Sequence, residues 1–138
     1  MGMAEQLAEQ LKTAWDSHDP ERVAALYGEN GVREEFLINH AVLTGRAEIA
    51  TQAGGYMHAV PDCVLEIRRV TESADGRLTV EWTWGGTHTN EIPGLPARGQ
   101  QVEIQGVAIY DMDGDLIARE NIYCDFSPML AAAGLLRG

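Results

Sequence analysis

The clearest strand signal in the chain is residues 77–90, with the sequence RLTVEWTWGGTHTN. Apolar and polar side chains alternate from Leu78 to Trp84, which is the period of a β-strand with one buried face. Asp-Gly pairs at 75–76 and 113–114 are typical of tight hairpins on either side of such strands. Four consecutive long strands are therefore predicted, at 63–73, 77–90, 100–112 and 115–125.

The part of the chain before these strands favours helices. Residues 4–17 carry Leu7, Leu11 and Trp15 on one helical face, and Asp19-Pro20 is a favourable start for a second helix over 20–28. A third helix is predicted over 46–59, after an extended segment at 32–44 with a bend near His40, and a short apolar helix or tail closes the chain at 127–136. Helices followed by long hairpins indicate an α+β fold, in which a strongly bent sheet wraps around three helices and leaves a cone with an open mouth.

Length and charge exclude several function classes. One domain over residues 1–138 is expected, and a net charge of −11 argues against partners such as nucleic acid or an anionic membrane. No apolar run approaches the roughly 18 residues of a membrane span, and the acidic amphipathic N-terminus is unlike a signal peptide, so a cytoplasmic location is expected. Cys63 and Cys124 lack metal-ligand spacing, so no metal site is predicted, and reduced thiols are favoured over a disulfide.

Asp125 is the leading candidate for chemistry. Asn121, Tyr123 and Asp125 follow each other at the strand period, so a regular strand places them on one face. A carboxylate among aromatic and apolar neighbours has a raised pKa, which suits general acid/base catalysis near neutral pH. The alternative is that Asp125 caps the terminal helix, where aspartate is a favoured residue.

Other polar groups on the predicted strands have two interpretations each. His88 lies between two threonines and either hydrogen-bonds a substrate oxygen or has a structural role. Gln105 binds a ligand carbonyl if it is buried, and an exposed glutamine is equally natural there. Four aromatic side chains either pack in the core or line a pocket for a flat ligand: Trp15, Tyr56, Trp82 and Trp84.

Taken in order along the chain, several short motifs resemble the SnoaL-like polyketide cyclases, a branch of the NTF2-like superfamily. They are Ala14–Asp19 at the end of the first helix, Leu43-Thr44-Gly45-Arg46 before the third, the Trp-x-Trp-x-Gly-Thr-His-Thr string from Trp82, and Gly94-x-Pro96. The resemblance implies an NTF2-like cone-shaped barrel with a deep apolar pocket, and an assembly of two or four identical subunits.

The resemblance also implies a reaction, an intramolecular aldol closure of a small hydrophobic, polyketide-like substrate without metal or organic cofactor. Asp125 would be the catalytic base and acid, and His88 and Gln105 would hydrogen-bond the substrate while Asn121 and Tyr123 lie beside the base. The chain departs from the family pattern at Ile122, where tryptophan is common, and at 97–99. Alternatives on the same fold are an isomerase, a dehydratase, an epoxide hydrolase or a non-catalytic ligand-binding module.

Overall fold

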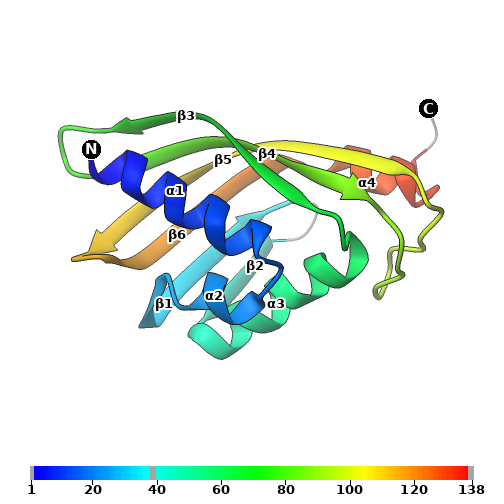
Figure 1. The fold of residues 1–138 in the computed structure, drawn as a ribbon, viewed down its shortest axis with the longest axis horizontal. Helices are drawn as coiled ribbons and strands as arrows, with labels where there is room; N and C mark the ends of the chain where they lie inside the picture. The colour runs from blue at the N-terminus through cyan, green and yellow to red at the C-terminus, as the bar shows by residue number, and fades with distance from the viewer. Residues whose placement is uncertain (1, 38–39, 137–138) are drawn as a thin grey trace.

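In residues 2–37 and 40–136, which the computed structural model describes, helices and strands follow an α+β order (Figure 1). The helices are α1 (Met3–Asp16), α2 (Pro20–Ala24), α3 (Arg46–Ala59) and α4 (Ser127–Ala132). The strands are β1 (Tyr27–Phe36), β2 (His40–Thr44), β3 (Val64–Glu72), β4 (Leu78–Thr87), β5 (Gln101–Asp113) and β6 (Leu116–Asp125). The predicted fold class is confirmed, and the four long strands and the third helix lie close to their predicted positions.

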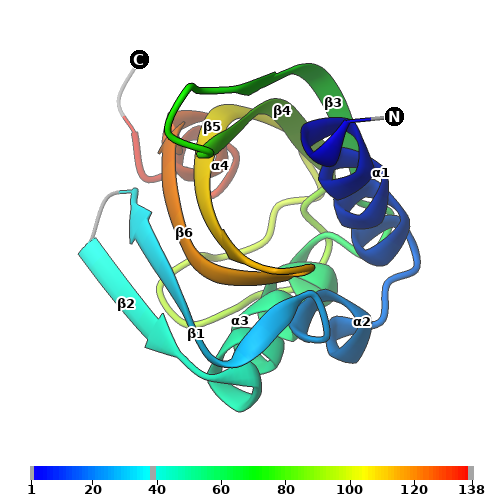
Figure 2. The same cartoon turned by 90° about the vertical axis from the view of Figure 1, so that its left-hand side faces the viewer.

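All six strands belong to one sheet, in the order β2-β1-β6-β5-β4-β3. Neighbours are antiparallel except β1 and β6, which are parallel, so the sheet is mixed. Figure 2 shows β4, β5 and β6 curving strongly, with α1 along one side and α2 and α3 below. The curvature gives the sheet a concave inner face, and it is this face that the helices partly cover.

The helices bury the faces that their sequence patterns predict. Leu7, Leu11 and Trp15 of α1 are buried, and α1 packs against β3 and β4. α3 packs against α2 and β1 and contributes Ile49 and Met57 to the core. No helix within the described residues is long and apolar enough to cross a membrane.

Two elements differ from the sequence prediction. The second helix ends at Ala24 instead of residue 28, because the backbone carbonyl of Leu26 accepts a hydrogen bond from the Ile117 amide and Tyr27 already belongs to β1. β6 is irregular near Ile117, where its register with β5 shifts. The bend expected near His40 falls at 38–39, outside the described residues.

Candidate active site

Two cavities lie between the concave face of the sheet and the helices. The inner cavity has a volume of about 80 Å³ and the outer one of about 480 Å³. They share the lining residues Glu35, Leu37, Tyr56 and Phe126, so they meet at that point. Apolar and aromatic side chains form most of the inner wall: Leu11, Trp15, Tyr56, Leu65, Ile67, Val80, Trp82, Trp84, Ile104, Ile122 and Phe126.

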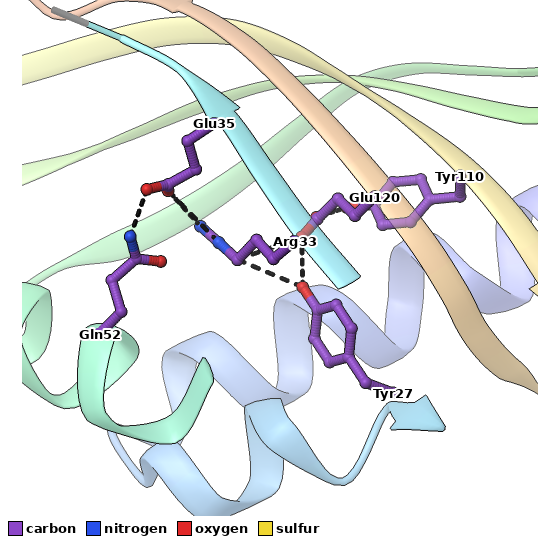
Figure 3. A network of polar contacts seen from close by, with 6 residues as sticks. All are labelled: Tyr27, Arg33, Glu35, Gln52, Tyr110 and Glu120. Atoms are coloured by element: carbon purple, nitrogen blue, oxygen red, sulfur yellow. Dashed lines mark hydrogen bonds and ion pairs between the residues drawn. The ribbon is translucent and has the colours of Figure 1, made fainter. Parts of the chain in front are cut away.

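A buried network of charged and phenolic groups forms the polar part of the inner wall (Figure 3). At its centre, the Arg33 guanidinium donates two hydrogen bonds to one oxygen of Glu35, at 3.3 and 3.2 Å. The same guanidinium donates to Glu120 at 3.3 Å and to the hydroxyl of Tyr27 at 3.2 Å. The side chains of Arg33, Glu35 and Glu120 are almost completely buried, so water does not screen these contacts.

The two carboxylates of this network have different partners. One oxygen of Glu120 accepts from Arg33 and Tyr27, and the other accepts from the hydroxyl of Tyr110. Glu35 accepts from Arg33 on one oxygen and from the side-chain amide of Gln52 on the other. Both oxygens of each carboxylate are therefore hydrogen-bonded, and Glu35 also lies where the two cavities meet.

The pleat of β1 explains how charged residues reach the interior. Arg33 and Glu35 point to the concave face, while Glu34 and Phe36 point to the outer face. There Glu34 pairs with charged neighbours and Phe36 stacks on the Tyr123 ring at a centroid distance of 4.8 Å. Both faces of the strand thus have their own partners, which fixes its register.

Burial keeps the phenols around the network protonated. The pKa values of Tyr27 and Tyr110 are raised well above the usual range, because burial disfavours the phenolate and Glu120 lies beside both. The pKa of Tyr56 is raised by burial first and then by the charge of Glu35. At neutral pH all three hydroxyls are therefore hydrogen-bond donors.

Arg33 remains a cation despite its burial. Desolvation lowers its pKa, but the charge of Glu120 and the other neighbouring groups outweigh this, so the net pKa is raised. The guanidinium carbon also lies 5.6 Å from the centroid of the Trp15 ring. With both carboxylates ionised, the network would carry one excess negative charge, which is costly in a buried site.

No cluster of three or more histidine, cysteine or acidic side chains is placed to hold a metal ion within residues 2–37 and 40–136. The sequence profile of the SnoaL-like polyketide cyclase family matches residues 5–133. The chain is a member of this family.

Solved structures similar to this SnoaL-like chain share its fold. A protein of ketosteroid isomerase-like fold from Catenulispora acidiphila is 22% identical, with a TM-score of 0.77 over 94% of this chain and 93% of that one. TsrD from Streptomyces laurentii is 20% identical, with a TM-score of 0.80 over 97% and 96% of the two chains. A phenazine biosynthesis-related protein from Pseudomonas aeruginosa is 20% identical, with a TM-score of 0.76 over 99% and 85%. A search of curated proteins found no match.

The strand carrying Asp125 presents that residue to solvent. Asn121, Tyr123 and Asp125 share one face, as predicted, but it is the outer face of the sheet and lines neither cavity. The Asp125 carboxylate accepts from the backbone N–H of Ser127, and hydrogen bonding by Ser127 lowers its pKa. The prediction of a desolvated Asp125 with a raised pKa is therefore wrong, and the alternative reading as a residue at the start of the last helix fits this contact.

Gln105 and His88 also lie outside the cavity walls. Gln105 is exposed and pairs with Asp125 across β5 and β6. His88 is fully buried, lines neither cavity, and neither ring nitrogen has a partner among the described residues. A substrate contact for either residue is not supported by these positions.

The aromatic candidates of the SnoaL-like chain do lie at the cavity. Trp15, Tyr56, Trp82 and Trp84 all line the inner cavity, and Tyr56 lines the outer one as well. Their contact with a substrate stays a prediction.

Sequence reasoning missed the charged residues Arg33, Glu35 and Glu120. For Glu120 a signal was present, because Ile122 and Cys124 are the apolar members of the β6 alternation and Glu120 shares their phase. For Arg33 and Glu35 the pattern pointed the other way, since the apolar members of that segment, Val32 and Phe36, lie on the outer face.

Proposed function

We propose that this chain catalyses a cofactor-independent acid/base reaction on a small hydrophobic carbonyl compound, with Glu35 as the group that exchanges the proton. The observation that carries the proposal is the position of Glu35, a buried carboxylate where the two cavities meet. Membership of the SnoaL-like polyketide cyclase family supports a substrate of polyketide type and an intramolecular aldol closure.

Glu35 is favoured over Glu120 by its position, because each carboxylate accepts three hydrogen bonds but only Glu35 lines both cavities. Glu120 accepts from two phenols and a guanidinium and lines the inner cavity alone. A substrate that extends from one cavity into the other would therefore lie beside Glu35. A carboxylate that takes up and returns a proton near neutral pH is what general acid/base catalysis requires.

The proposed reaction starts with removal of a proton from the carbon next to a substrate carbonyl. The Glu35 carboxylate takes this proton, and the C–H bonding electrons form an enolate. The enolate carbon then attacks a second carbonyl carbon of the same molecule, which forms the new C–C bond. Glu35 returns its proton to the resulting alkoxide, so the enzyme ends in its initial state.

Tyr56 is proposed as the donor to the enolate oxygen. It lines both cavities near Glu35, and its raised pKa keeps the hydroxyl protonated. A neutral donor held in place by packing stabilises an enolate without the cost of rearranging solvent. Arg33 and Gln52, which both bond to Glu35, would fix the orientation of the carboxyl group.

The test compares the same isosteric change at two carboxylates. Exchange of the α-hydrogens of butyrophenone for deuterium is followed by proton NMR in heavy water, with wild type, Glu35→Gln and Asp125→Asn. The expected result is exchange by wild type and by Asp125→Asn and a loss of at least about 100-fold in Glu35→Gln, within the range of general acid/base catalysis. Unchanged exchange in Glu35→Gln would refute the assignment.

Wild-type protein that binds butyrophenone without exchanging it would favour the ligand-binding module. Self-association, which the family resemblance implies, stays a prediction that sedimentation velocity would test.

A further inference from the structure

The two cavities on either side of Glu35 differ sixfold in size. The inner one, at about 80 Å³, is about half the size of a cavity of roughly 150 Å³ that holds benzene, so it has room for about three carbon atoms. The outer one, at about 480 Å³, lies within the range of sites that hold a ring system. A molecule whose reacting carbon lies at Glu35 must therefore extend a short arm into one and a bulkier body into the other.

The inner cavity offers an arm few polar partners. Both oxygens of Glu120 are engaged by the network, and the hydroxyls of Tyr27 and Tyr110 donate to them. The Trp84 N–H has no acceptor of good geometry among the described residues. It lies near the Cys63 thiol, where burial raises the pKa of the thiol and the Trp84 N–H lowers it by a smaller amount. A polar arm would lose its hydration without gaining hydrogen bonds, so an apolar arm is favoured.

The length of the arm is limited by walls that cannot easily yield. Position 106 on β5 is glycine, and a Cβ there would lie 2.5 Å from the Trp82 ring. The indole thus occupies the space of a missing side chain and forms part of the inner wall. Val80 is almost fully buried and forms another part of the inner wall. Because packed interiors resist overfilling, each group beyond the available volume lowers affinity.

We infer that the substrate carries a short apolar arm of about three carbons or fewer on one side of the reacting carbonyl and a bulkier group on the other. The inference rests on the proposed function for the position of the carbonyl, but the size limit follows from the cavities alone. It names a class of substrate, an alkyl ketone or ester joined to a larger ring-containing body.

Phenyl alkyl ketones from acetophenone to octanophenone test the limit, because only the alkyl arm changes. Dissociation constants come from amide shifts in proton–nitrogen NMR titrations, with wild type, Val80→Ala and the matched control Val64→Ala, whose side chain is exposed. In wild type we expect affinity to rise with arm length to about three carbons and to fall about tenfold by seven, the size expected for overpacking. Val80→Ala should move the optimum outward by one or two carbons, and Val64→Ala should not.

Three results would overturn the inference: affinity that rises steadily to octanophenone, an optimum that is unchanged in Val80→Ala, and no binding of any ketone. If Val80→Ala does not fold, Ile67→Val enlarges the same wall by one methylene. Deuterium exchange by wild type and by Glu35→Gln, measured beside the same ketone series, separates the two proposals. A retained length optimum without deuterium exchange in wild type leaves the size limit standing and removes the catalytic role of Glu35, and exchange without an optimum does the reverse.

Discussion

Glu120 and Glu35 provide two isosteric substitutions whose costs in stability should differ. Glu120→Gln replaces an oxygen that accepts from Tyr110, or the one that accepts from Arg33 and Tyr27, by an amide group that cannot accept. Hydrogen bonds to a charged group contribute about 1.5–3 kcal/mol each and neutral ones about 1 kcal/mol, so weakening three of them should cost about 3 kcal/mol.

Glu35→Gln should cost less than about 1 kcal/mol, because the amide oxygen still accepts from Arg33. The buried Oε1 of Gln52 has no partner among the described residues. If the Gln52 amide rotates by half a turn, this oxygen can accept a hydrogen bond from the new amide group at position 35.

The assay is urea unfolding at pH 7, followed by the fluorescence of the three tryptophans. The comparison holds when both variants unfold with the wild-type m-value, since the two folded states then bury similar surface. Equal costs for the two substitutions, or a larger one for Glu35→Gln, would refute the argument that a glutamine side chain can satisfy the partners of Glu35 but not those of Glu120.

Three further results are expected. Asp125 should titrate below 3.8, because hydrogen bonding from Ser127 lowers its pKa. Its contribution to stability should be present above the pKa of the unfolded chain and lost as pH falls through the pKa of the folded protein. A midpoint raised towards neutrality in a carbon NMR titration would contradict this. Gly106→Ala should destabilise by about 1–3 kcal/mol in urea unfolding, since the methyl group would overlap Trp82. Burial raises the pKa of Cys63 to about 11 and of Cys124 to about 12, so a disulfide reagent at pH 8 should label both thiols only after unfolding.

Local sequence patterns were sufficient for most of the fold. The alternation from Leu78 to Trp84 predicted β4, and the Asp-Gly turn at 113–114 separates β5 from β6 as expected. These signals are local because a strand or turn depends on residues within a few positions of each other. The second helix was predicted too long because Tyr27 pairs with β6 as the first residue of β1. Such tertiary pairing overrides local helix propensity.

The location of the site depended on contacts that no local pattern contains. The register shift in β6 puts Ile117 on the inner face although Arg119, two residues later, points outward, so the phase of the strand could not be extended from one end to the other. Asp125 was favoured by the family resemblance, yet its carboxylate lies on the outer face.

By itself, the sequence determined the α+β class, the hairpins and the aromatic residues that line the inner cavity, because each follows from short-range periodicity and side-chain type. The tertiary structure decided which acids are buried. Arg33 meets Glu120 from 87 positions away in the chain, and only that meeting makes a charged pair in the interior tolerable. Whether a carboxylate lies in solvent, as Asp125 does, or in the interior, as Glu35 does, depends on the face of the sheet to which it points, and the folded sheet alone sets that face.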